Sequence, residues 1–275
     1  MKTFALALGA GGARGLAHIA VFEALDELGV KPAAISGSSV GAVMGAAYAA
    51  GIPPKALRRH AIEMVHNRAE MYRRLLGARA SAWAWSSVLR VPFGHNPVLL
   101  DAEKFCTAFL PEGLPETFAG LTIPLMVIAS DLYGRAEVIF SEGPLVPAIA
   151  ASMAIPGLVQ PVEHEGRVLV DGAAVDPLPF TQLTGKADVI VAIDCSPGPS
   201  ERTTVPGAWD AVFAAITLMG QTIVAEKLHR ARPDLLIRPN VSVFRMLDFT
   251  QAIAIVRAGE AIKDEIKHEL TALLA

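Results

Sequence analysis

The chain has 275 residues, of which 52% are hydrophobic and 19% are charged, and its formal net charge is −3. This composition fits one large α/β domain with an ample core, and the slightly acidic balance excludes a protein built mainly to bind nucleic acid. The two cysteines, Cys106 and Cys195, provide neither a disulfide framework nor metal-ligand spacing, and they fit a reducing compartment.

The first fifty residues alternate between strand and helix signals. Residues 3–8 (TFALAL) predict a short buried strand that runs into the glycine-rich sequence GAGGARG at residues 9–15. A helical pattern follows and stops at Gly29. Residues 31–37 predict a weak strand, and residues 42–50 predict a helix of small residues.

The rest of the chain continues this alternation. Residues 55–76 predict a helix, residues 77–100 are irregular, and residues 196–207 predict a mobile loop. Further strands are predicted at residues 123–130, 136–141, 167–173, 188–195 and 234–241, followed by a terminal amphipathic helix at residues 251–274. The pattern predicts an α/β fold with a mostly parallel central sheet flanked by helices.

Two stretches lack charge over about the length of a membrane span, at residues 32–54 and 143–162. The second contains four prolines, which disfavour a continuous helix, and the first is rich in Gly, Ala and Ser rather than Leu and Ile. We therefore assign both stretches to a protein core. The N-terminus carries no signal-peptide pattern.

Ser39 is the candidate nucleophile. It follows a predicted strand and precedes a predicted helix, and Gly37 and Gly41 flank it in the pattern Gly-x-Ser-x-Gly. A strand-to-helix turn of this kind is so tight that side chains at the flanking positions would clash, and it exposes the hydroxyl at a helix N-terminus. The competing interpretation is a set of small residues that lets a helix pack closely on the sheet.

The glycine-rich sequence at residues 9–15 offers backbone N–H groups to an anion. A dinucleotide phosphate is disfavoured because the glycines fail the G-x-G-x-x-G spacing and no acidic residue ends a second strand at the required distance. A tetrahedral oxyanion is favoured, with the N–H groups of Gly11, Gly12 or Ala13 as donors. A plain glycine turn with a solvated Arg14 is the third interpretation.

Asp171 is the candidate base. It follows the apolar segment at residues 168–170 and precedes Gly172. An ordinary Asp-Gly turn is the alternative. An unperturbed Asp has a pKa of about 3.9, which is low for a base at neutral pH, and burial at the end of an apolar strand would raise that pKa.

Four blocks together resemble the bacterial patatin-like phospholipase family. GAGGARGLAHIAVFEAL resembles the glycine-rich oxyanion block of that family, GSSVG its nucleophile elbow, ASMAIPGLVQPV its Ala-Ser-x-x-x-Pro block and VDGA its Asp-Gly block. The resemblance implies a three-layer α/β/α fold and one domain over residues 1–275. Its motif-bearing core covers residues 4–185, and residues 186–275 pack on that core as a C-terminal strand and helices.

The resemblance also implies a Ser-Asp dyad. Ser39 would attack an ester carbonyl, Asp171 would accept its proton, and N–H groups of Gly11, Gly12 and Ala13 would hold the oxyanion. The implied supporting positions of these motifs are Arg14, Gly15, Gly37, Gly41 and Gly172. Arg14 would either buttress the loop or lie near an anionic head group.

Two positions depart from the family pattern, and three histidines need an assignment. Ala10 stands where many relatives have glycine, and Ala173 replaces the second glycine of the Asp-Gly block. His229 and His268 follow Asp171, as a triad histidine would, but both lie in charged, helix-like surroundings, so we interpret them as solvated or structural. We expect His18 to support the oxyanion loop.

The resemblance implies hydrolysis of lipid acyl esters without a metal or a cofactor. A short-chain carboxylesterase and a non-catalytic lipid-binding protein are the alternatives, and a nicotinamide-dependent oxidoreductase is disfavoured by the glycine spacing. Residues 68–100 combine arginines with Trp83 and Trp85 and predict a lid or a peripheral membrane contact, with a partly buried excursion as the alternative. Because the resemblance is to bacterial members, we expect a cytoplasmic protein that touches the inner membrane surface.

Overall fold

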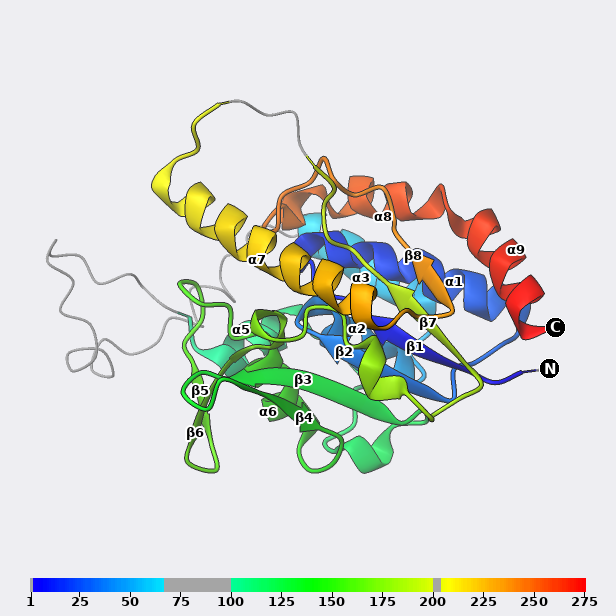
Figure 1. Ribbon diagram of the computed structural model, residues 1–275, viewed down its shortest axis with the longest axis horizontal. Coiled ribbons are helices and arrows are strands. Elements are labelled where there is room, and N and C mark those ends of the chain that lie inside the picture. The colour runs from blue at the N-terminus through cyan, green and yellow to red at the C-terminus, as the bar shows by residue number, and fades with distance from the viewer. Residues whose placement is uncertain (1, 67–99, 200–203) are drawn as a thin grey trace, which may run out of the picture.

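The computed structural model describes residues 2–66, 100–199 and 204–275, and these build a sheet of eight strands covered by helices (Figure 1). The strands are β1 (Phe4–Leu8), β2 (Ala34–Ser38), β3 (Leu125–Asp131), β4 (Ala136–Phe140), β5 (Val162–His164), β6 (Arg167–Asp171), β7 (Val189–Ile193) and β8 (Leu235–Ile237). The helices are α1 (His18–Leu28), α2 (Val40–Ala49), α3 (Pro54–His66), α5 (Ala102–Phe109), α6 (Leu145–Ser152), α7 (Ala208–Arg230), α8 (Ala252–Glu260) and α9 (Lys263–Leu274). Short 3₁₀ turns are η1 (Gly12–Ala17), η3 (Phe118–Gly120), η4 (Gly172–Ala174), η5 (Phe180–Leu183) and η6 (Phe249–Gln251).

The sheet has the strand order β5-β6-β3-β2-β1-β7-β8, with β4 also paired to β3. The pairs that join β3, β2, β1, β7 and β8 are parallel, and the pairs that involve β4, β5 and β6 are antiparallel. The predicted α/β fold with a mostly parallel sheet is confirmed. Strands β4, β5 and β6 form an antiparallel part at one side of the sheet, and β5 was not predicted from the sequence.

Strand β3 is longer than its neighbour β2, and this difference positions the site. Val127 and Ile128 pair with β2 on one side and with β4 on the other, whereas Ala129–Asp131 pair with β6 and β4. Strands β2 and β6 therefore lie on the same side of β3 and meet end to end. Ser38 is opposite Ile128, and Asp171 is opposite the next residue, Ala129.

The alternation of β1 separates the two faces of the sheet. Phe4, Leu6 and Leu8 belong to a large cluster that includes residues of α1, α2, α5, α6, α8 and α9. Ala5 and Ala7 face a smaller cluster with η5 and α7. The expected three-layer arrangement is present, but one layer consists mainly of α7.

Several predicted boundaries change. The terminal helix is divided into α8 and α9, because the chain turns after Gly259, which lies close to the backbone of Ala17, and both helices then pack on α1. Strand β8 ends at Ile237, shortly before Pro239, which cannot donate to the sheet. The predicted helix at residues 55–76 is described up to His66 as α3.

The uncharged stretch at residues 32–54 forms β2 and α2, and every residue of α2 is buried. Most of α6, within the second stretch, is buried too. Another helix, α7, is the one described helix whose length and composition would allow it to cross a membrane. Sequence analysis assigned no element to its residues. Residues 68–99 of the predicted lid lie outside the described residues.

Candidate active site

The backbone between β2 and α2 makes a strained turn at Ser39. Ser39 has φ 54° and ψ −124°, a conformation that is uncommon for residues other than glycine. A Cβ atom at Gly37 would lie 2.5 Å from the carbonyl oxygen of Gly41, and one at Gly41 would lie 2.1 Å from that of Leu8. The two glycines of the Gly-x-Ser-x-Gly pattern are therefore required by close backbone contacts, as the sequence predicted.

The end-to-end arrangement of β2 and β6 brings Ser39 and Asp171 together. Ser39 Oγ donates a hydrogen bond of 2.7 Å to Asp171 Oδ2, and both side chains are about 95% buried, with exposed fractions of 5% and 6%. A Cβ atom at Gly172 would lie 2.2 Å from the carbonyl oxygen of Ile128, so glycine allows β6 to end tightly against β3. The structure thus joins two residues that are far apart in the sequence.

The environment of Asp171 raises its pKa to about 6, as the sequence led us to expect. Burial is the main cause because it disfavours the charged form, and the hydrogen bonds from Ser39 and from the Ala173 N–H act in the opposite direction. Ser130 Oγ donates to the backbone oxygen of Asp171 and fixes the strand end. The carboxyl group is therefore both oriented and titratable near neutral pH.

The glycine-rich loop approaches the same place. Gly12 lines the pocket that contains Ser39, and its φ of 58° suits glycine. The N–H of Ala13 donates to the carbonyl oxygen of Met246 at 2.7 Å, so this predicted oxyanion donor is engaged within the protein in this conformation. Gly15 packs against Val40, the first residue of α2, where a Cβ atom would collide.

Two buried side chains support the loop from behind. Arg14 Nε donates to the carbonyl oxygen of Gly11 at 3.1 Å, and burial lowers the pKa of Arg14. His18 Nε2 lies 3.0 Å from the carbonyl oxygen of Gly9, and burial lowers its pKa to about 4. With this pKa, His18 is neutral at pH 7, and because a carbonyl oxygen only accepts, the ring proton lies on Nε2. The expected support by His18 is present, and Arg14 also bonds to the loop.

Two residues of the site had no assigned role in the sequence analysis. Ser152, in the Ala-Ser-x-x-x-Pro block, accepts a hydrogen bond from the Ser39 N–H at 2.9 Å. His60 lines the pocket with Ser39, but its Nε2 contacts the carbonyl oxygen of Phe109 at 3.1 Å. The motif block could have indicated Ser152, whereas nothing local in the sequence places His60 near Ser39.

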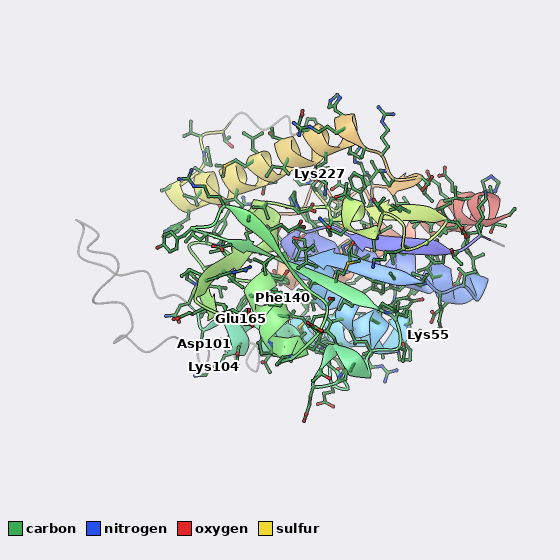
Figure 2. All side chains as sticks on the ribbon, turned by 60° about the horizontal axis from the view of Figure 1, so that its bottom comes forward. Lys55, Asp101, Lys104, Phe140, Glu165 and Lys227 are labelled. Atoms are coloured by element: carbon green, nitrogen blue, oxygen red, sulfur yellow. The ribbon has the colours of Figure 1, made fainter. Side chains whose placement is uncertain are left out.

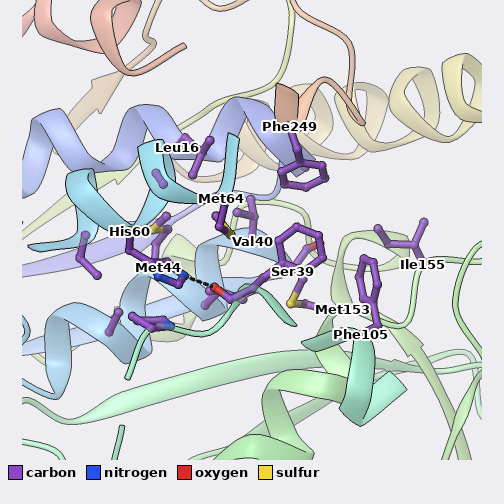
Figure 3. A pocket seen from close by; sticks show the side chains of 17 residues that line it. Leu16, Ser39, Val40, Met44, His60, Met64, Phe105, Met153, Ile155 and Phe249 are labelled. Carbon is purple, nitrogen blue, oxygen red and sulfur yellow. Dashed lines mark hydrogen bonds between the residues drawn. The ribbon is translucent and has the colours of Figure 1, made fainter. Parts of the chain in front are cut away.

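The pocket beside Ser39 is almost entirely apolar (Figure 3). Its cavity measures about 40 Å³. The side chains that line it come from α2, α3, α5 and the segment before β5, and they include Met44, Leu57, Met64, Phe105, Met153 and Ile155. Phe249 of η6 closes one side. The hydroxyl of Ser39 is thus reached from an apolar chamber.

The two histidines that follow Asp171 lie elsewhere. His229 is on the last turn of α7 and His268 is on α9, and both side chains are exposed. In residues 2–66, 100–199 and 204–275, no group of three or more His, Cys, Asp or Glu side chains could hold a metal ion. The polar side chain that contacts Ser39 Oγ is that of Asp171.

Several known proteins are similar to this chain in sequence or in fold. A family model described as patatin-like phospholipase matches residues 6–184. An uncharacterized NTE family protein of Mycobacterium tuberculosis is 38% identical over 213 residues, which cover 74% of this chain and 54% of that protein. Lysophospholipase NTE1 of Coccidioides immitis is 27% identical over 303 residues, covering 98% of this chain and 18% of that protein.

The chain therefore spans about half the length of the mycobacterial relatives and a smaller part of the fungal one. Among solved structures, VipD from Legionella pneumophila is similar with a TM-score of 0.51 and 16% sequence identity, covering 98% of this chain and 67% of that chain. At this level of identity the likeness concerns the fold.

Proposed function

Because this chain belongs to the patatin-like phospholipase family, we propose that it is a serine hydrolase that cleaves carboxylic esters of lipids through Ser39 and Asp171. The contact of 2.7 Å between Ser39 Oγ and Asp171 Oδ2, at a strained strand-to-helix turn, carries this proposal. The name of the fungal relatives, lysophospholipase, supports a lipid ester as substrate. The apolar walls of the pocket beside Ser39 suit an acyl chain.

The reaction would proceed in two halves. Ser39 Oγ attacks the ester carbonyl carbon while Asp171 Oδ2 takes the hydroxyl proton, and the carbonyl oxygen becomes an oxyanion. When the bond to the leaving oxygen breaks, Asp171 returns the proton to that oxygen and the alcohol departs. A water molecule then attacks the acyl-enzyme, Asp171 takes its proton, and Ser39 Oγ leaves with that proton as the fatty acid is released.

The oxyanion would lie against the glycine-rich loop. The N–H groups of Gly11 and Gly12 are the proposed donors, supported by the bonds from Arg14 and His18 to the neighbouring carbonyl groups. The N–H of Ala13 could join them only if its bond to Met246 opened. Because Gly12 and Ser39 line one pocket, the loop is better placed for an oxyanion than for a dinucleotide phosphate.

The test is ester hydrolysis by the wild-type protein and by Ser39→Ala, over a series of acyl chains from acetate to palmitate. We expect Ser39→Ala to lower kcat/KM by roughly a thousand-fold or more, because the nucleophile is lost. Ser38→Ala is the matched control. Ser38 is the preceding residue, and its buried Oγ has no hydrogen-bond partner among the described residues.

Two outcomes would contradict the proposal. Full activity in Ser39→Ala would exclude the Ser-Asp pair, and a wild-type protein inactive on every ester would favour the non-catalytic lipid-binding protein. A maximum at the short end of the series would favour the short-chain carboxylesterase, for which the small cavity of about 40 Å³ is the supporting observation. The membrane contact at residues 68–100 and the cytoplasmic location stay predictions.

A further inference from the structure

Helix α7 carries an apolar face that the other described residues leave uncovered. Residues 211–225 contain no charged side chain, yet Val224 is the buried residue of the helix. Four exposed side chains lie within about 120° of one another around the helix axis. We call this side the outer face of α7 and define it by Val212, Ala215, Leu218 and Met219.

An exposed helix of a folded domain normally turns a polar face to water. The outer face of α7 does the opposite, since Val212, Leu218 and Met219 are 43%, 63% and 57% exposed. Of the ten exposed large hydrophobic side chains in the described residues, five lie between residues 205 and 219. Contiguous apolar surface of this kind marks an interaction site rather than a scattered exposure.

The C-terminal end of α7 is anchored to the rest of the protein. Lys227, which Figure 2 labels on α7, donates from Nζ to both carboxylate oxygens of Asp176, at 2.7 and 2.8 Å, and to the carbonyl oxygen of Leu178. Val224 packs in the cluster on that face of the sheet. The uncharged run at residues 211–225 would span about 22 Å, less than the roughly 30 Å of a hydrocarbon core, so α7 is suited to lie along a lipid surface rather than to cross it.

The N-terminal end of α7 lies beside the walls of the Ser39 pocket. The Trp209 ring is 3.4 Å from the position of a Cβ atom at Gly157, two residues after the pocket residue Ile155. Asp210 pairs with Arg245 at 3.8 Å, in the segment that leads to the pocket residue Phe249. One end of the outer face therefore lies near the walls of the Ser39 pocket.

We propose that the outer face of α7 docks on a lipid surface and so places the Ser39 pocket at the lipid boundary. The choice of occupant rests on the proposed function, because a lipid-ester hydrolase must take its substrate from lipid. The lack of charge on this face matches the hydrocarbon region, the charged groups lie at the two ends of the helix, and Trp209 is a residue type enriched at lipid–water boundaries.

The first experiment is flotation of the full chain with phosphatidylcholine vesicles. Leu218→Glu/Met219→Glu places two carboxylates on the outer face. Ala261→Glu/Ala272→Glu is the matched control, because it adds the same charge at exposed positions in or next to α9. Helix α9 lies at the opposite end of the molecule from the N-terminal end of α7 (Figure 1). We expect the first variant to lose vesicle affinity at least about tenfold, and the control to bind like the wild-type protein.

A second measurement separates docking from chemistry. We expect Leu218→Glu/Met219→Glu to hydrolyse a soluble short-chain ester at the wild-type rate and vesicle phospholipid more slowly, whereas Ser39→Ala should float normally. If Ser39→Ala floats but the wild-type protein hydrolyses nothing, docking stands and the proposed function fails. If Leu218→Glu/Met219→Glu floats like the wild-type protein, docking on α7 is overturned, whatever the activity.

A second copy of the chain is an alternative occupant of the outer face. Sedimentation velocity without lipid would detect it. A wild-type dimer that Leu218→Glu/Met219→Glu converts to a monomer, with flotation unchanged, would assign the face to self-association and overturn the proposal. A wild-type monomer that floats, and a variant monomer that does not, is the expected result.

Discussion

Helices α2 and α7 are both apolar and lie on opposite faces of the same sheet, and they differ in what covers them. All ten residues of α2 are buried, and its small side chains allow close contact with β1, β2 and β3. Helix α7 has 23 residues and is similarly free of charge over residues 211–225, yet one of its residues is buried. An apolar helix alone therefore does not identify a core, and its neighbours decide its role.

The largest expected effect comes from the same substitution in each helix. In α2, Gly41→Ala places a Cβ atom 2.1 Å from the backbone oxygen of Leu8, which cannot move away, so we expect a loss of about 3 kcal/mol in unfolding free energy. In α7, Gly220→Ala meets no atom closer than 3.8 Å. There we expect a gain of about 0.5–1 kcal/mol, because alanine favours the helix.

Denaturant unfolding of the two variants measures this difference. Equal shifts of both midpoints in the destabilising direction would show that α7 is packed as tightly as α2.

A pair of methionines gives the next effect. Met44 on α2 is 7% exposed and Met219 on α7 is 57% exposed. We expect Met44→Ala to lower the unfolding free energy by roughly 2 kcal/mol, through the lost burial and the cavity and partly offset by the helix preference of alanine. Met219→Ala should change it by no more than about 0.5 kcal/mol. A large loss for Met219→Ala in lipid-free solution would mean that another protein surface covers the outer face.

The smallest effect is a response to pH. It should change hydrolysis by Asp171 and by Ser39, which precedes α2, and leave vesicle binding by α7 unchanged. Asp171 must be ionised to accept a proton, and its pKa is about 6. We expect kcat/KM on a soluble ester to fall below pH 6, approaching tenfold per pH unit. The outer face of α7 has no titratable group, so vesicle flotation should stay constant over the same range. Activity that is level down to pH 4 would exclude Asp171 as the base.

The raised pKa of Asp171 also makes stability depend on pH, in the opposite direction to activity. Burial raises the pKa of Asp171 from the unfolded value of 3.8 to about 6, so the folded protein binds the proton more tightly than the unfolded chain. Asp171 therefore contributes stability that is fully present below pH 4 and is lost as the pH rises through 6. We expect Asp171→Asn to be more stable than the wild-type protein at pH 7, which thermal unfolding would measure.

The sequence predicted the region of α2 well because its signals are local. Gly37, Ser39 and Gly41 are close in the chain, and the clash that requires the glycines arises within the turn and with the neighbouring strand. The same holds for the helix stop at Gly29, which has φ 67°. The sheet class followed from the alternation of strands and helices.

The sequence did not predict α7, because a helix that is apolar on every side gives no periodic signal. Other missed features depend on distant contacts. The bond from Ser39 N–H to Ser152 spans 113 residues, and the bond from Ala13 N–H to Met246 joins two ends of the chain. No local pattern encodes such pairs, which appear only when the strands have assembled.

The part of β3 that extends beyond β2, residues 129–131, also affects the order in which the protein folds. Ser39 and Asp171 are 132 residues apart, and their contact exists only after β6 has added to the free part of β3. Non-local antiparallel pairing of this kind forms slowly, because the entropy of closing a long loop opposes it. We therefore expect refolding chains to recover their helical circular dichroism before they recover Ser39-dependent hydrolysis, so that catalytic competence reports the last step of sheet assembly.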